Sequence, residues 1–340
     1  MKMTKIWMLV LTMVLFLAAC SSGNADSKEA EDEGLVKGDL EFYTSQPDTD
    51  ATELVNKFNE KYPDVNVKVF RSGTEEVIGK LLAEKEAGAV QADVLLVADS
   101  VTFESLKVQD LLAAYESPEH ANIPEEFVDV DHMYAGTKVM ATILAVNTGK
   151  VSELPTSWNV LTEADAKNES IMPSPLYSGA AAYNVGVFTR QGNFGWDFFE
   201  KLKDNSSMVV QGNGAALKAV TGGEKSYAMV VDFIVARAKA EGSPIELIYP
   251  EEGVPVITEP IGLLKDAKNE AAAKAFIDFV LSEEGQQVAA DIGYTPIREG
   301  VAAPEGLKTI SEMDVLTAPL NELLQTREEE KRQFKELFGE

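Results

Sequence analysis

Apolar and polar residues alternate with two different periods along the chain. Segments that are apolar at every second position, or in an unbroken run, indicate strands, and segments with apolar residues three and four positions apart indicate helices. From the amino end, the pattern predicts a strand at 39–43, a helix at 50–62, a strand at 65–70, a helix at 75–87 and a strand at 92–97. The run ADVLLV in the last of these is typical of a strand buried on both faces of a parallel sheet. We therefore expect an α/β fold.

A second block with the same alternation runs from about residue 155 to residue 250. Two long apolar strands, Thr137 to Thr148 and Gly253 to Leu264, flank this block and are expected to cross between two lobes. Helical patterns follow, and those at 311–340 are expected to dock on the first lobe. The predicted boundaries are 39–145 with 256–340 for lobe 1 and 146–255 for lobe 2.

The amino end has the pattern of a secretion signal. Two lysines precede a short apolar run, and Leu17 to Cys20 (LAAC) resembles the bacterial lipobox. This pattern predicts a signal peptide at 1–19 and lipidation of Cys20, although Cys20 could instead be an incidental thiol at an ordinary cleavage site. Residues 20–38 are polar and acidic, and we expect a flexible tether that holds a folded body at a membrane by lipid alone.

Composition excludes several classes of function. The formal net charge of -26 argues against nucleic acid binding and against a basic membrane-binding patch. The single cysteine allows no intramolecular disulfide, and His120 and His132 lack the spacing of a zinc site. The acidic pair Glu251-Glu252 is more typical of a solvated turn than of a catalytic dyad. We expect no enzyme activity, no cofactor and no resident metal.

Polar loops follow three of the predicted strands, at 44–50, 71–76 and 98–105. Each loop has residues that commonly cap the next helix, which is the structural alternative to a binding role. Because the carboxyl ends of parallel strands meet at one edge of a sheet, the three loops together predict a cleft. The candidate donors from the first lobe are Ser45, Gln46 and Ser100, and Asp48 could contribute a carboxylate.

The stretch PSPLYSGAAAYNVG, residues 173–186, breaks the chain with two prolines and then begins a helix of small residues. The first amide groups of a helix have no partner within it, and small side chains let an outside group approach them. An anion held at Ser178, Gly179 and Ala180 would satisfy these amides. Tyr177 could form part of the wall of the same cleft.

As a set, these segments resemble the bacterial extracellular solute-binding proteins of ABC importers, in the branch with ferric-ion, hexose-phosphate and 2-aminoethylphosphonate binders. The resemblance spans FYTSQPDTDATELVNKFNEKYP, ADVLLVADSVTFESL, PSPLYSGAAAY, NGAALKAVTGGEKSYAMVVDF and FIDFVLSEEGQQVAADIGYTPIR. It implies a two-lobe periplasmic-binding-protein-like fold with two crossing hinge strands and a C-terminal helical segment. It also implies a monomer that works with a permease and an ATPase.

The resemblance implies an anion site at Ser178-Gly179-Ala180 and Asn213. The iron ligands of the ferric binders are not matched, because their positions carry Pro47, Ala98 and Asp232-Phe233. An anion site together with an acidic Asp232 would suit a zwitterion, and 2-aminoethylphosphonate is the expected ligand.

Three alternatives remain open. Asp232 could cap the next helix or pair with Arg237 or Lys225. A hexose phosphate or another organic phosphate would use the same anion site without an acidic partner. A ferric ion with an accompanying anion is the third possibility.

Overall fold

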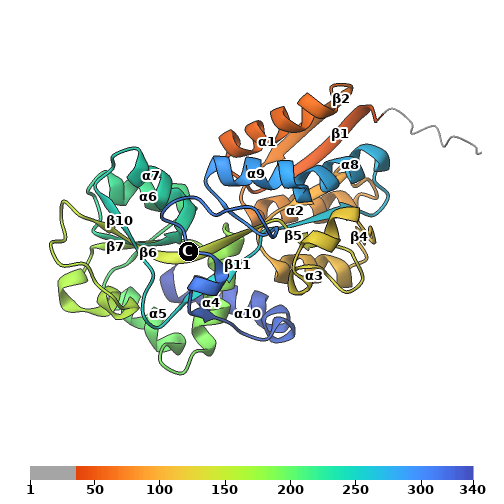
Figure 1. Ribbon diagram of the computed structural model, residues 1–340. Helices are drawn as coiled ribbons and strands as arrows, with labels where there is room; N and C mark the ends of the chain where they lie inside the picture. The colour runs from red at the N-terminus through yellow and green to blue at the C-terminus, as the bar shows by residue number, and fades with distance from the viewer. Residues whose placement is uncertain (1–35, 340) are drawn as a thin grey trace, which may run out of the picture. The chain divides into compact units, whose positions relative to one another are not determined.

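The computed structural model describes residues 36–339 of the chain (Figure 1). The predicted signal peptide, most of the predicted tether and the predicted lipidation at Cys20 lie outside the described residues. Within residues 36–339, no helix combines the length and the apolar character that crossing a bilayer requires.

The first sheet has six strands in the order β2-β1-β3-β12-β4, with β5 beside β12. The strand β1 is parallel to β2 and β3, whereas β12 is antiparallel to β3, β4 and β5. The strands are β1 (Gly38–Thr44), β2 (Val65–Arg71), β3 (Val94–Leu96), β4 (Leu112–Ala113), β5 (Ala135–Gly136) and β12 (Pro260–Leu264). The helices of this lobe are α1 (Asp48–Lys61), α2 (Thr74–Glu86), α3 (Ser100–Val108), α8 (Glu270–Leu281) and α9 (Glu283–Ile292).

The second sheet has eight strands, and its core order is β14-β11-β6-β9-β7-β8, with β10 and β13 also paired to β6. The strands are β6 (Lys138–Asn147), β7 (Ser170–Pro173), β8 (Met208–Val210), β9 (Tyr227–Val231), β10 (Ile245–Ile248), β11 (Val254–Ile257), β13 (Thr295–Pro296) and β14 (Val315–Leu316). The helices of this lobe are α4 (Gly179–Arg190), α5 (Gly195–Asp204), α6 (Asn213–Thr221), α7 (Asp232–Ala240) and α10 (Leu320–Phe338). Short 3₁₀ helices lie at Pro118–Asn122, Glu125–Phe127, Trp158–Thr162, Ala164–Ala166 and Ile310–Glu312.

The chain passes between the lobes at two adjacent points, which confirms the predicted crossing strands. The strand β6 is buried along its whole length, as its apolar sequence requires, and it follows β5 of the first sheet after one residue, Thr137. The return passage joins β11 to β12 through Thr258 and Glu259. The two passages are bonded together, because Thr137 donates its amide to the Thr258 carbonyl at 3.0 Å and its hydroxyl to the Glu259 carbonyl at 2.7 Å.

The C-terminal segment departs from the prediction. It was expected on the first lobe, but β14 pairs with β11 of the second sheet and α10 packs most extensively against α4 of the second lobe (Figure 1). Phe334 of α10 is fully buried in the core of the second lobe, which explains the preference. Helix α10 packs next most extensively against α3 of the first lobe, so the expected contact with that lobe is present as well.

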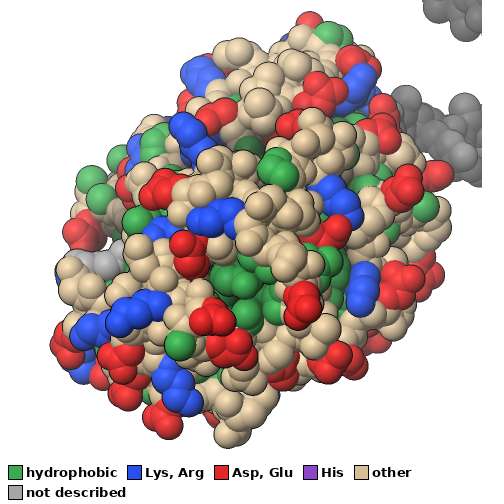
Figure 2. Space-filling model, turned by 90° about the vertical axis from the view of Figure 1, so that its left-hand side faces the viewer, with side chains coloured by type: hydrophobic (Ala, Val, Ile, Leu, Met, Phe, Trp, Pro, Cys, Tyr) green, Lys and Arg blue, Asp and Glu red, His purple; other side chains and the backbone are tan. Residues whose placement is uncertain are grey.

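Charges of both signs are spread over the surface. Figure 2 shows the side of the second lobe that lies away from the first, with acidic and basic side chains distributed over it and hydrophobic ones gathered in one central area. Because the protein as a whole carries a formal charge of -26, an anion can be held only where local groups outweigh this background.

Candidate functional site

A cavity of about 330 Å³ lies between the two lobes. The first lobe contributes its wall at the ends of β1, β2 and β3, where Ser45, Arg71 and Ala98 lie. This is the sheet edge at which the three polar loops were expected to meet. The crossing passages and the segment after α9 add Met140, Glu259 and Tyr294.

The N-terminal ends of four helices meet at this cavity. Helices α2, α4, α6 and α7 begin at Thr74, Gly179, Asn213 and Asp232, and cap or first-turn residues of each one line the wall. Ser178 caps α4 by accepting the Ala181 amide at 3.3 Å. Within the described residues, the N-cap side chains of α2, α6 and α7 make no capping hydrogen bond, and in α7 the carboxylate of its first residue, Asp232, accepts the Phe233 amide. The positive ends of four helix dipoles therefore face one small space.

Arg71 supplies a full positive charge at the same wall. It ends β2, and its Nε donates to the Gln46 carbonyl at 2.6 Å, which fixes the plane of the guanidinium group. The nearest acidic oxygen recorded for it belongs to Asp48, at 4.0 Å from Nη1. A guanidinium group held in this way can offer paired donors to a phosphoryl or carboxylate group.

One carboxylate, that of Glu259, also lines the cavity, and its charge is balanced locally. Lys138 Nζ lies 2.5 Å from the Glu259 carboxylate, and both side chains are almost fully buried on the crossing passages. The same ammonium group lies 4.8 Å from the centre of the Tyr294 ring. The charges of Glu259 and Lys138 offset each other. The remaining local charge at the cavity comes from Arg71 and the helix N-terminal ends, and it is positive.

Direct contacts between the lobes enclose the cavity. Glu75 of α2 donates its amide to the Tyr177 carbonyl at 3.3 Å, and Arg237 of α7 binds both carboxylate oxygens of Asp50 in α1 at 3.0 and 2.8 Å. A side chain at Gly179 would place its Cβ 2.6 Å from the Ala98 carbonyl oxygen of the first lobe. The small residue that starts α4 therefore allows this close approach.

Five of the residues predicted from sequence line the cavity: Ser45, Tyr177, Ser178, Ala180 and Asn213. Asn213 donates from Nδ2 to the Ser178 hydroxyl at 3.4 Å and accepts the Val231 amide at 3.3 Å. These two bonds connect the starts of α4, α6 and α7. Gly179 lies at the contact between the lobes, next to the cavity.

Three predicted residues of the first lobe do not reach the cavity wall. The Gln46 side chain is buried beside a separate small void, and the Asp48 side chain is mostly exposed to solvent. Ser100 lies in the first turn of α3, where Asp99 is the cap. Strand-end position alone does not determine the direction of a side chain, and in the loop after β1 the residues that line the cavity are Ser45 and Pro47.

Asp232 requires the main correction. Its neighbours Val231 and Phe233 line the cavity, but Asp232 does not, and the carboxylate is fully buried in the second lobe. Oδ1 accepts the Phe233 and Ala141 amides at 2.9 and 3.2 Å, and Oδ2 accepts the Tyr249 hydroxyl at 3.0 Å. Burial raises the pKa of Asp232 to about 7. Its place is structural, and it is not available to a ligand cation.

Several lining residues were not predicted, namely Arg71, Thr74, Gln211, Phe233, Glu259 and Tyr294. For Arg71 a signal existed, because it opens the loop RSGTEE that was identified as a strand-end loop. Glu259 and Tyr294 come from the crossing passage and the segment after α9, and they reach the cavity only through the tertiary fold.

The histidines stack on one another away from the cavity. The rings of His120 and His132 lie 5.5 Å apart at an angle of 15°. In residues 36–339, no group of three or more His, Cys, Asp or Glu side chains is placed to hold a metal ion.

Comparisons with known proteins agree with this architecture. Residues 53–314 match the family model described as bacterial extracellular solute-binding protein. A protein of Haemophilus influenzae is 28% identical over 300 residues, which is 85% of this chain and 83% of that protein. A putative 2-aminoethylphosphonate-binding periplasmic protein of Salmonella typhimurium is 24% identical over 282 residues, or 79% of this chain and 78% of that protein.

Among solved structures, the periplasmic binding protein AfuA from Actinobacillus pleuropneumoniae, with exogenous fructose-6-phosphate bound, superposes with a TM-score of 0.82. The alignment covers 89% of this chain and 99% of that chain at 24% identity. At this level of identity the likeness shows the fold, and it confirms the predicted two-lobe architecture.

Proposed function

Since the chain belongs to the bacterial extracellular solute-binding proteins, a family of extracytoplasmic binding proteins rather than enzymes, we propose that it captures a phosphorylated small molecule, of the sugar phosphate class, for an ABC importer. The observation that carries this proposal is the meeting of four helix N-termini and Arg71 at one enclosed cavity. A doubly charged phosphoryl group matches both the backbone amides and the guanidinium fork.

The remainder of the cavity suits an uncharged, hydroxyl-bearing group. A volume of about 330 Å³ lies at the lower end of the ~300–1,000 Å³ range of small-molecule sites and leaves space beyond a phosphoryl group. The Glu259 carboxylate, whose charge is offset by Lys138, can accept hydrogen bonds from hydroxyl groups. Phe233 and Tyr294 supply flat apolar surfaces for a sugar ring.

The two other ligand classes have less support from the geometry. The carboxylate proposed for the ammonium group of 2-aminoethylphosphonate, that of Asp232, does not reach the cavity, and Glu259 is already paired with Lys138. A ferric ion would face the guanidinium group of Arg71 and the positive helix ends, which repel a cation. Lipid attachment at Cys20 and assembly of a monomer with a permease and an ATPase remain part of the proposal.

Isothermal titration of the protein with glucose 6-phosphate tests the ligand class. We expect binding of glucose 6-phosphate or fructose 6-phosphate, weaker binding of inorganic phosphate and no heat with glucose. Tighter binding of 2-aminoethylphosphonate or of ferric citrate than of either sugar phosphate would overturn the proposal and identify the other class.

Arg71→Met tests the site itself. The variant loses hydrogen bonds to a charged group, which contribute about 1.5–3 kcal/mol. We therefore expect its affinity to drop roughly tenfold to a hundredfold. The matched control is Arg332→Met, because Arg332 is exposed on α10 and pairs with Glu329. Equal affinities for the wild type and both variants would show that Arg71 does not contact the ligand.

A further inference from the structure

Helix α10 is attached to the second lobe. Phe334 lies in that lobe's core, and Leu323 packs so closely on α4 that a Cβ at Gly186 would lie 2.6 Å from its Cδ2. The carboxylate of Glu330 accepts from Arg190 of α4 at 2.5 Å. A movement of the second lobe therefore carries α10 with it.

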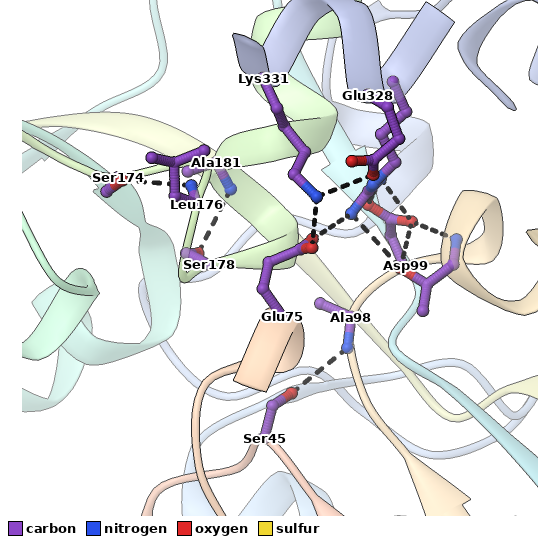
Figure 3. Close-up of polar contacts among 12 residues, drawn as sticks. Ser45, Glu75, Ala98, Asp99, Ser174, Leu176, Ser178, Ala181, Glu328 and Lys331 are labelled. Atoms are coloured by element: carbon purple, nitrogen blue, oxygen red, sulfur yellow. Dashed lines mark hydrogen bonds and ion pairs between the residues drawn. The ribbon is translucent and has the colours of Figure 1, made fainter. Parts of the chain in front are cut away.

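Arg327 and Lys331 lie between Leu323 and Phe334 on the same helix, and they bind acidic side chains of the first lobe. Arg327 Nη1 binds the Asp99 carboxylate at 2.9 and 3.2 Å, and Nη2 binds Glu75 Oε1 at 3.1 Å. Lys331 Nζ binds Glu75 Oε2 at 2.7 Å (Figure 3). Arg327 is nearly fully buried and Asp99 is fully buried, so these charges depend on each other for compensation.

Both acidic residues directly follow residues of the cavity wall. Glu75 follows Thr74, and Asp99 follows Ala98. Figure 3 shows Glu75 at the start of α2, between the start of α4 and the side chains of α10. The Glu75 amide also makes the hydrogen bond to the Tyr177 carbonyl of the second lobe. The ion pairs thus act on the same backbone segments that form the first lobe's side of the cavity.

We propose that Arg327 and Lys331 are positioning residues of the solute site, which hold the starts of α2 and α3 against the second lobe when the cavity is closed. The C-terminal helix then links lobe closure to the placement of the cavity wall without touching the solute. The inference is independent of which solute is bound, because the contacts join protein to protein. It extends the role of α10 beyond packing on the second lobe.

Hydrogen exchange in the protein without added solute tests the contact between the lobes. In Lys331→Met, we expect faster exchange at the amide of residue 75 and in residues 178–182, which lie on opposite lobes. Arg332→Met, one residue further along α10, is the control and should leave both segments unchanged. Faster exchange confined to α10 would show that Lys331 only stabilises its own helix, and would overturn the proposal.

A double-mutant cycle separates positioning from simple stabilisation. Lys331→Met and Glu75→Gln are each expected to lower the affinity for glucose 6-phosphate about tenfold, and the double variant should lose little more than either one. Coupling seen in the melting temperature but absent from affinity would overturn the proposal, because the pair would then be equally formed in open and closed protein. If the wild type binds no sugar phosphate, the proposed ligand class fails, and the exchange experiment alone decides the role of α10.

Discussion

Asp232→Asn is expected to stabilise the protein at neutral and alkaline pH while leaving solute binding unchanged. The asparagine has the same shape, its Oδ1 can accept the same two amides, and its Nδ2 can donate to the Tyr249 oxygen. The substitution therefore removes a buried charge, while the Tyr249 hydroxyl hydrogen loses the acceptor that it has in Asp232. Since Asp232 does not line the cavity, the affinity for glucose 6-phosphate should stay within roughly twofold of the wild-type value.

The magnitude follows from the pKa of Asp232. Burial raises this pKa from 3.8 to about 7, a shift of about three units at 1.36 kcal/mol each, or about 4 kcal/mol. Between these pH values the folded protein keeps the proton and the unfolded chain has lost it. The free energy of unfolding therefore falls as pH rises from 4 to 7, and this contribution of Asp232 is absent above the folded pKa.

Urea unfolding of wild type and Asp232→Asn across pH 4 to 8 measures the effect. At each pH, the free energy of unfolding of the wild type is subtracted from that of the variant, so that the contributions of the acids common to both cancel. This difference should rise by up to about 4 kcal/mol from pH 4 to pH 8. Tyr249→Phe is the matched comparison, because losing the hydroxyl donor raises the pKa of Asp232 further and extends the pH dependence to higher pH. A difference that is the same at pH 4 and pH 8 would refute the reasoning. A selective loss of 2-aminoethylphosphonate binding would instead restore Asp232 as an ammonium partner.

Two further substitutions probe closure and pH response. Gly179→Ala should weaken sugar phosphate binding at least tenfold in a titration, because its Cβ would lie 2.6 Å from the Ala98 carbonyl oxygen. Gly79→Ala, within α2 and with open space around it, does not line the cavity and should leave the affinity unchanged. Equal affinities of the two variants would contradict the close approach. Burial and the neighbouring His132 lower the pKa of His120, so the folded protein resists its protonation and stability should fall as pH drops through about 6.5. Thermal melts of His120→Gln should show a weaker dependence from pH 7 to pH 5, and an unchanged dependence would exclude this contribution.

The sequence alone determined the α/β alternation, the two crossing strands and the serine-capped, small-residue start of α4. These features are local, because strand and helix periods, a buried run such as that of β3 and a serine cap before small residues depend on residues close together in the chain. The same holds for Ser45, which faces the cavity from the end of β1.

Only the tertiary structure decided which strand-end side chains reach the cavity and where the C-terminal helix docks. Asp232 ends an apolar strand, as the sequence shows, but its direction depends on how β9 packs beside β6, and that packing turns the carboxylate toward Tyr249. Arg71 and Glu259 line the same cavity only because the two lobes close around it. The burial of Phe334 places α10 on the second lobe, because a fully buried aromatic ring contributes more to the free energy of folding than the polar face of the helix does. Contacts between residues distant in sequence set these outcomes, and local patterns do not encode them.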